Sequence, residues 1–190
     1  MGIVLASGSP RRRELLQMIG IEGFKVIPAE GEEEVSPGLP PGQTVCKIAL
    51  QKAKTVSAMC DSDDVIIAAD TLVYLDGRPI AKPGGPEEAT TMLKELSGRK
   101  HSVYTGIALL KGGIQMTGSE ATDVYFREIS DREIAAYVKT GEPMDKAGAY
   151  GAQGRAAVFV ERIEGEFFNV MGLPLCRLSI MLRDFGVIIQ

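Results

Sequence analysis

Residues 65–71 read VIIAADT, an apolar run that ends at Asp70. An uninterrupted apolar run of this length is typical of a central strand that is buried on both faces. We therefore predict such a strand, with an acid at its carboxyl end. A carboxylate there can bind a divalent metal or activate a water, or it can simply cap the following turn. Considered alone, Asp70 favours a functional role and a capping role about equally.

The same segment predicts a hairpin directly after the strand. It continues extended to Leu75, and Asp76-Gly77 favours a tight two-residue turn. Such a loop pairs Leu75 with Arg78 and Thr71 with Lys82. Directly opposed residues stand about 5 Å apart at Cβ. The turn is thus expected to bring Lys82 back beside the aspartate.

The amino terminus predicts a strand, a tight turn and a helix. Residues 3–6 are apolar, and Ser9-Pro10 suits the N-cap and the first position of a helix. Arg11, Arg12 and Arg13 follow, and their positive charges interact unfavourably with the helix dipole unless a bound anion compensates them. We interpret this turn as a phosphate or carboxylate site, because guanidinium groups pair with such oxygens. The alternative is a solvated basic turn, and Arg13 is expected to face solvent.

Two lysines are candidate phosphate ligands. A helix is predicted over residues 44–59, and Lys52 lies on its apolar stripe, three residues after Ala49. A lysine on an inward face is unusual. The alternative to a phosphate contact is, for Lys52, an apolar stem whose ammonium group reaches water. For Lys82 it is an exposed charge at an edge. Taken one at a time, each lysine is better explained by its alternative. Both alternatives become less favoured when the two lysines are considered together with Asp70 and the arginines.

Two irregular segments complete the candidate site. Residues 28–42 form a long loop with four glutamates, one of which is a plausible metal ligand while most are solvated. Residues 145–154 are rich in glycine, which permits close backbone approach to a ligand. An ordinary surface loop explains the second segment at least as well.

The remaining pattern predicts an α/β fold with a mixed sheet, because helices alternate with strands but hairpins intervene. Ser130 and Glu133 form a capping box that begins a helix. Other expected helices cover residues 10–19, 86–97 and 174–184. Other expected strands cover residues 102–110, 114–126, 156–163 and 167–170.

The length and composition of the chain disfavour several classes of function. A chain of 190 residues favours one domain, residues 1–190. The net charge of -4 and the aromatic content of 6% disfavour binding of a nucleic acid polymer. Three widely spaced cysteines suggest neither a disulfide framework nor a metal site, which suits a reducing cytosol. We find no signal peptide or membrane-spanning run, so we expect a cytoplasmic protein without membrane contact.

Together these residues predict a local cationic pocket that contains one or two acids. Such a pocket suits metal-assisted phosphoryl or nucleotidyl chemistry on a small phosphorylated ligand. Neither a Walker loop nor a kinase signature occurs in the sequence. The individual residues do not identify the reaction or the ligand more closely than this.

The ordered combination of motifs resembles the Maf family, once described as inhibitors of septum formation. The matching segments are LASGSPRR at 5–12, ELL at 14–16, QKA at 51–53, ADT at 69–71, KP at 82–83, LSG at 96–98, DKAGAYG at 145–151, QG at 153–154 and GLP at 172–174. They extend along nearly the whole chain, so the resemblance is specific.

The resemblance implies an elongated α/β fold with a cleft between two lobes, similar to inosine triphosphatase-like proteins. It implies hydrolysis of a nucleoside triphosphate between its α and β phosphates, with Mg²⁺ or Mn²⁺. By matching positions, Asp70 would be the general base or a metal-linked acid, and Glu33 would assist the metal. A homodimer is a further expectation from the family. The residues that would hold the phosphates and support the first loop are Arg12, Lys52, Lys82, Ser7 and Ser9.

Three positions favour the branch of the family that acts on dTTP and UTP. Members acting on methylated guanine nucleotides carry Trp, Ser and Glu where this chain has Arg11, Thr71 and Gln153. A glutamine amide both donates and accepts, which complements the edge of thymine or uracil, whereas glutamate only accepts. The resemblance thus implies a dTTP/UTP pyrophosphatase whose substrate contacts include these three residues.

Two other functions compete with this prediction. A non-catalytic, nucleotide-sensing regulator of septum formation or cell division needs the cations but not Asp70. A phosphatase that releases orthophosphate needs the same groups and differs in its product.

Overall fold

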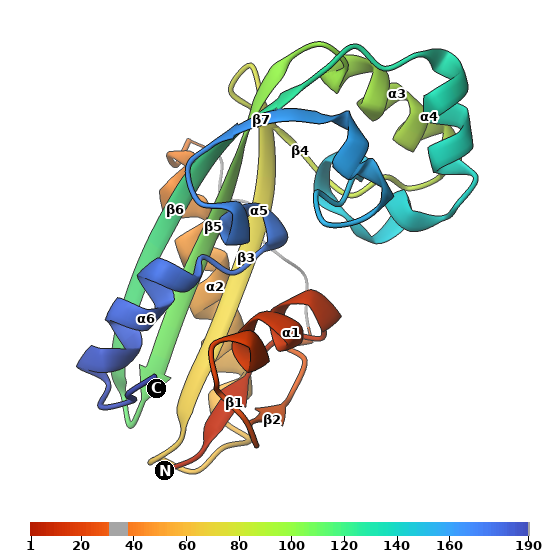
Figure 1. The fold of residues 1–190 in the computed structure, drawn as a ribbon. Coiled ribbons are helices and arrows are strands. Elements are labelled where there is room, and N and C mark those ends of the chain that lie inside the picture. Colours follow the sequence, from red (N-terminus) through yellow and green to blue (C-terminus); the bar gives the residue numbers. More distant parts are fainter. Residues whose placement is uncertain (31–37, 190) are drawn as a thin grey trace. The chain divides into compact units, whose positions relative to one another are not determined.

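The structure, a computed structural model, describes residues 1–30 and 38–189. Its core is a seven-stranded mixed sheet of order β2-β1-β3-β5-β6-β7, with β4 paired to β3 (Figure 1). The strands are β1 Ile3–Leu5, β2 Lys25–Val26, β3 Val65–Leu75, β4 Arg78–Ile80, β5 Lys100–Lys111, β6 Ile114–Phe126 and β7 Val160–Glu164. The helices are α1 Pro10–Met18, α2 Pro41–Ser57, α3 Pro86–Leu96, α4 Asp131–Val138, α5 Phe167–Met171 and α6 Leu175–Asp184. This arrangement confirms the predicted α/β class with a mixed sheet.

The chain divides into two compact units. Unit 1 contains residues 1–70, 105–120 and 172–190, and unit 2 contains residues 71–104 and 121–171. Strands β3, β5 and β6 each contribute residues to both units. The single domain expected from chain length stays a prediction, and the units are described separately below.

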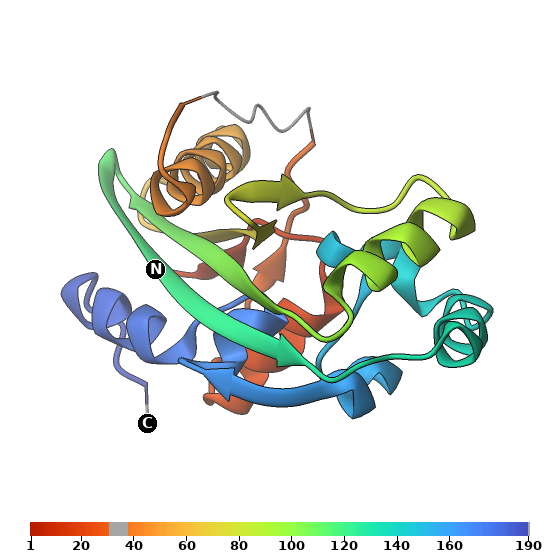
Figure 2. The ribbon, with the colours of Figure 1, turned by 90° about the horizontal axis from the view of Figure 1, so that it is seen from above.

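In unit 1 the helices cover both faces of the sheet. Helix α2 lies on one face, while α1 and α6 lie on the other (Figures 1 and 2). Side chains alternate along a strand, so every second residue of β3 faces α2. Ile66 and Ala68 accordingly pack in one core cluster with Ala49 and Ala53 of α2.

Gly106 brings the backbone of β5 close to α2. A Cβ at this position would lie 2.5 Å from the backbone nitrogen of Cys46, a separation that real side chains do not adopt. Only glycine permits this approach. The contact holds α2 closely against β5, the neighbour of β3 in the sheet.

Strand β3 does not end at Asp70, as the sequence predicted for the apolar run, but includes the extended residues up to Leu75 that the predicted hairpin requires. It continues through residues 65–75, so Asp70 lies inside an unbroken strand rather than at its carboxyl end. The cause is the hairpin: Leu75 pairs with Arg78 and Val73 with Ile80, in the predicted register. Strand β4 ends at Ile80, so Lys82 lies beyond the ladder, and the predicted Thr71–Lys82 pair is not part of it.

Unit 2 has its own core between its strand segments and α3, α4 and three 3₁₀ turns. The turns are η1 Glu142–Asp145, η2 Ala147–Ala149 and η3 Arg155–Phe159. Leu93 of α3, Ile134 of α4 and Phe159 of η3 are buried in one cluster. The capping box of Ser130 and Glu133 begins α4 as predicted.

Two strands predicted in this unit are wrong in part. Residues 155–159 form a 3₁₀ turn, and only 160–164 pair as β7. Residues 167–171 form the short helix α5 instead of a strand. Periodicity cannot separate helix from strand in so short an apolar run. Asn169 of α5 is buried and donates to the Val103 carbonyl and to Thr122 Oγ1, which ties this turn to β5 and β6.

His101 is buried in unit 2, and its Nε2 lies 2.8 Å from Tyr150 Oη. Burial lowers the pKa of His101 to about 4. Below pH 6.5 the unfolded chain therefore binds a proton that the folded chain does not, so stability falls as the pH decreases toward 4. We expect wild type to lose about 2–3 kcal/mol more than His101→Gln between pH 7 and pH 4.5. Urea unfolding at both pH values checks this, and equal losses would contradict it.

No helix in the described ranges is both long enough and apolar enough to span a membrane.

Candidate functional site

The site in unit 1 is built on two adjacent parallel strands. Leu5 of β1 pairs with Ile67 of β3, and the Ala6 amide donates to the Ile67 carbonyl at 2.8 Å. The chain leaves β1 at this point and enters the loop that begins with Ser7. Because the strands run in parallel, this loop emerges beside the part of β3 that leads to Asp70. Two candidate segments far apart in sequence thus become neighbours.

Ser7 organises the first turn of α1. Its Oγ accepts hydrogen bonds from the Ser9 amide at 3.3 Å and from Arg12 Nη1 at 3.0 Å. Arg12 Nε donates to the Gly172 carbonyl at 2.7 Å. Ser9 occupies the N-cap position, but its side chain makes no capping bond. The arginine is therefore held beside the loop by both its own turn and the segment before α6.

Arg11 and Arg13 differ in their surroundings. Arg11 is half-buried, whereas Arg13 is exposed, which confirms the expectation that Arg13 faces solvent. The first turn of α1 contains no acid. This helix start accordingly keeps the cationic character on which the anion-site interpretation depends.

Lys52 and Asp70 form an ion pair inside unit 1. Residue 70 lies on the face of β3 that packs against α2, in phase with Ile66 and Ala68. Lys52 Nζ donates to Asp70 Oδ1 at 2.7 Å, with side-chain exposures of 18% and 5%. The inward lysine that the sequence left unexplained therefore has a buried carboxylate as a partner.

The second carboxylate oxygen of Asp70 is the unusual feature of this pair. Oδ2 is buried, and within residues 1–30 and 38–189 it has no hydrogen-bond partner. Buried polar atoms nearly always have partners, so this oxygen is suited to a cation or to a reacting water. The described part of the chain holds no group of three or more His, Cys, Asp or Glu side chains that could bind a metal ion. Glu33, the second predicted metal ligand, lies outside the described residues.

Unit 2 contains the other candidates. Thr71 is half-buried in β3, while Lys82 and Gln153 are exposed. The Ala81 carbonyl, next to Lys82, accepts from the Gly148 amide at 3.1 Å. A Cβ on Gly148 would lie 3.2 Å from the Val73 side chain, and its φ is +70°. The glycine-rich segment thus lies against β3 and the residue that follows β4, as its composition permits.

Sequence reasoning missed several residues that shape these segments. Gly172 stands in a quoted motif, but nothing in the sequence links its carbonyl to Arg12. Tyr137 and Glu142 contact the segment that carries Gln153, as described below. Their spacing of five residues across a helix end gives no local signal for this role.

Comparison with known proteins places these segments in context. The model of the family described as "Maf-like protein" matches residues 2–185. A dTTP/UTP pyrophosphatase of Methanosarcina mazei is 48% identical over 97% of this chain and 94% of its own. Proteins with the same name from Pelotomaculum thermopropionicum and Bacillus cereus are 47% and 44% identical, each over 97% of this chain and 96% of the relative.

Solved structures share the fold at low sequence identity. The Ham1 protein of Staphylococcus aureus superposes with a TM-score of 0.53 at 14% identity, covering 97% of this chain and 99% of that one. A HAM1 protein of Coxiella burnetii gives 0.51 at 19% identity with the same coverage. These likenesses concern the fold alone.

Proposed function

Because this chain belongs to the Maf-like protein family, we propose that it hydrolyses dTTP and UTP to the nucleoside monophosphate and pyrophosphate. Its relatives named dTTP/UTP pyrophosphatase match nearly the full chain at 44–48% identity. Modified uridine triphosphates fall within the same substrate class.

The buried Lys52–Asp70 pair is the observation that carries this proposal. A binding module would need cations for the phosphates, but it would gain nothing from a buried carboxylate that pairs with one of those cations. The arrangement suits catalysis, because Lys52 orients the carboxylate through Oδ1 while Oδ2 can take a proton from water or bind a cation. This favours an enzyme over a nucleotide-sensing regulator of cell division.

We assign the phosphate contacts to the loop after β1 and to the lysines. Ser7 and Ser9 shape that loop, and Arg11 and Arg12 supply guanidinium groups for phosphate oxygens. Lys52 and Lys82 add ammonium charges, which suit phosphate oxygens as point charges. Thr71 and Gln153 are assigned to the nucleoside.

Asp70 and Glu33 would hold a divalent cation, Mg²⁺ or Mn²⁺. The fit rests on Asp70 Oδ2, a buried carboxylate oxygen of the hard type that these cations prefer. The bound cation would neutralise phosphate charge and polarise the phosphorus–oxygen bond. Its requirement is tested by turnover in EDTA against turnover with each metal added back.

Gln153→Glu tests the base-reading role of this exposed side chain. We expect kcat/KM for dTTP to fall about 10–100-fold, because glutamate cannot donate to a thymine carbonyl and its charge repels that oxygen. The free energy of unfolding should change by less than about 0.5 kcal/mol, since the side chain is exposed. Pyrophosphate release and urea unfolding measure the two effects. Equal dTTP turnover by both proteins would remove Gln153 from base recognition.

A panel of nucleoside triphosphates, with separate detection of pyrophosphate and orthophosphate, tests the proposal as a whole. We expect pyrophosphate from dTTP and UTP, with much slower turnover of purine nucleotides. Binding without turnover would indicate a regulator, and orthophosphate would indicate a different phosphohydrolase.

The family resemblance also leads us to propose a cytoplasmic homodimer. Light scattering of the purified chain tests the dimer, and cell fractionation tests the location.

A further inference from the structure

The turn that carries Gln153 is fixed at both ends by other residues of unit 2. The Gly154 amide donates to the Gly151 carbonyl at 2.9 Å, which closes a tight turn with Ala152 and Gln153 at its centre. Ala152 is buried and Gln153 is exposed. The direction of the glutamine side chain therefore depends on how this turn is held.

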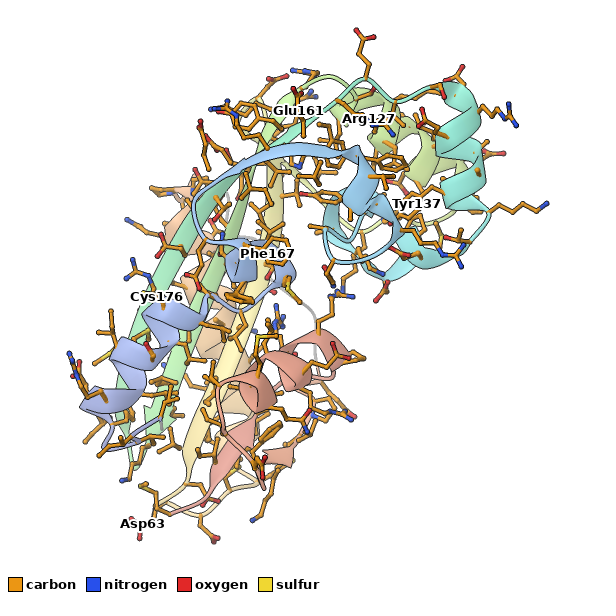
Figure 3. All side chains as sticks on the ribbon, viewed as in Figure 1. Asp63, Arg127, Tyr137, Glu161, Phe167 and Cys176 are labelled. Carbon is orange, nitrogen blue, oxygen red and sulfur yellow. The ribbon has the colours of Figure 1, made fainter. Side chains whose placement is uncertain are left out.

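Tyr137 of α4 holds the entry of the turn. The Gly151 amide donates to Tyr137 Oη at 3.3 Å. The tyrosine is only 4% exposed, and its ring packs edge-on against Phe159 with centroids 5.4 Å apart. Figure 3 labels Tyr137, which lies where α4 meets the 3₁₀ segments. The hydroxyl thus extends from a rigid ring.

Glu142 holds the exit of the turn. The Arg155 amide donates to its carboxylate oxygens at 3.1 and 3.2 Å. Tyr137 Oη donates to Glu142 Oε1 at 3.1 Å, so a single carboxylate links both ends of the turn. A Cβ on Gly154 would lie 2.8 Å from Glu142 Cδ, so glycine leaves the space that the carboxylate fills.

We propose that Tyr137 and Glu142 are positioning residues for base selection, which act by clamping the Gln153 turn. This inference rests on the proposed function, since it assigns Gln153 to the base edge of the nucleotide. Hydrogen bonds to a charged group are stronger than neutral ones, so the shared carboxylate suits a clamp. The exposed glutamine gains a fixed backbone from buried neighbours and is thereby preorganised for its ligand.

The test compares Tyr137→Phe with a matched control, Tyr125→Phe. Both substitutions keep the ring and remove a hydroxyl that donates to a glutamate, but Tyr125 Oη contacts Glu164, on β7. We expect Tyr137→Phe to lower the ratio of kcat/KM for dTTP to that for dCTP about tenfold, mainly through KM for dTTP. Tyr125→Phe should change this ratio less than twofold.

A double-mutant cycle separates positioning from general loosening. In a Gln153→Ala background, Tyr137→Phe should change the dTTP-to-dCTP ratio less than twofold, because the side chain it positions is absent. An equal change with and without Gln153, or no change in either, would overturn the inference. If Tyr137→Phe does not fold, Glu142→Gln replaces it, since the amide keeps the shape and loses the charge.

Amide hydrogen exchange provides a readout that does not need turnover. Tyr137→Phe should speed exchange at Gly151 and Arg155 about tenfold, and Tyr125→Phe should leave both unchanged. Unchanged exchange would refute the clamp itself. A wild type that cleaves no triphosphate would refute the proposed function and, with it, the link to base selection. Normal dTTP turnover with an unaltered base ratio would refute this inference alone.

Discussion

Asp70→Asn is expected to lower the rate of pyrophosphate release from dTTP by about 10³-fold. Removing a general base or a metal-linked carboxylate has effects of this size. Asparagine keeps the size of the side chain, so the loss would reflect the missing charge and proton acceptor. The measurement is kcat at saturating dTTP and Mg²⁺, with circular dichroism to establish folding.

Asp64→Asn is the matched control for this substitution. Asp64 is also a buried aspartate of unit 1, it stands directly before β3, and its Oδ1 accepts from the Gly2 amide at 2.8 Å. It also resembles Asp70 in having a buried Oδ2 without a partner in the described part of the chain. We expect the control to retain kcat within about twofold. Similar losses in both variants would mean that the effect is not specific to Asp70.

Lys52→Met is expected to lower the free energy of unfolding by about 2–4 kcal/mol. Methionine fills a similar volume, but the change leaves a buried carboxylate without its ammonium partner. Adding Asp70→Asn should restore part of this loss, since the unpaired charge is then gone. Urea unfolding of the two single variants and the double variant measures both effects.

Lys54→Met provides the comparison on the same helix. Lys54 is exposed, so its replacement should cost no more than about 0.5 kcal/mol. An equal cost at both positions would indicate that the helix, rather than the ion pair, responds. A double variant as unstable as the sum of the single variants would argue against energetic coupling of Lys52 and Asp70.

The local patterns of the sequence predicted most elements of the fold. The hairpin at Asp76-Gly77 and the capping box at Ser130 each depend on residue types that one turn or one helix start requires. Each of these signals is contained within a few residues. For that reason the hairpin register and the start of α4 were correct.

Two boundaries were placed wrongly although their signals are local, and only the partner of Lys52 depended on distant residues. Strand β3 passes through Asp70 because the hairpin extends the ladder, so the strand end was placed too early. Helix α2 begins at Pro41, three residues before the expected start, since proline is favourable in the first turn. The stripe position of Lys52 suggested that it needed a partner, but only the fold identified Asp70.

The candidate site shows the same limit. Arg12 was named from a helix start with an unusual charge, which is a local signal, whereas Ser7 was named from the family resemblance. The bond from Arg12 to the Gly172 carbonyl spans most of the chain, and the clamp of Tyr137 and Glu142 crosses a helix end. Such contacts depend on packing between elements rather than on local sequence.

The products of dTTP hydrolysis test the central claim most directly. Phosphorus NMR of wild type with dTTP and Mg²⁺ should show dTMP and pyrophosphate appearing at equal rates, and Asp70→Asn should slow both about 10³-fold. Formation of dTDP and orthophosphate, or unchanged dTTP with wild type, would contradict the claim that this protein cleaves between the α and β phosphates.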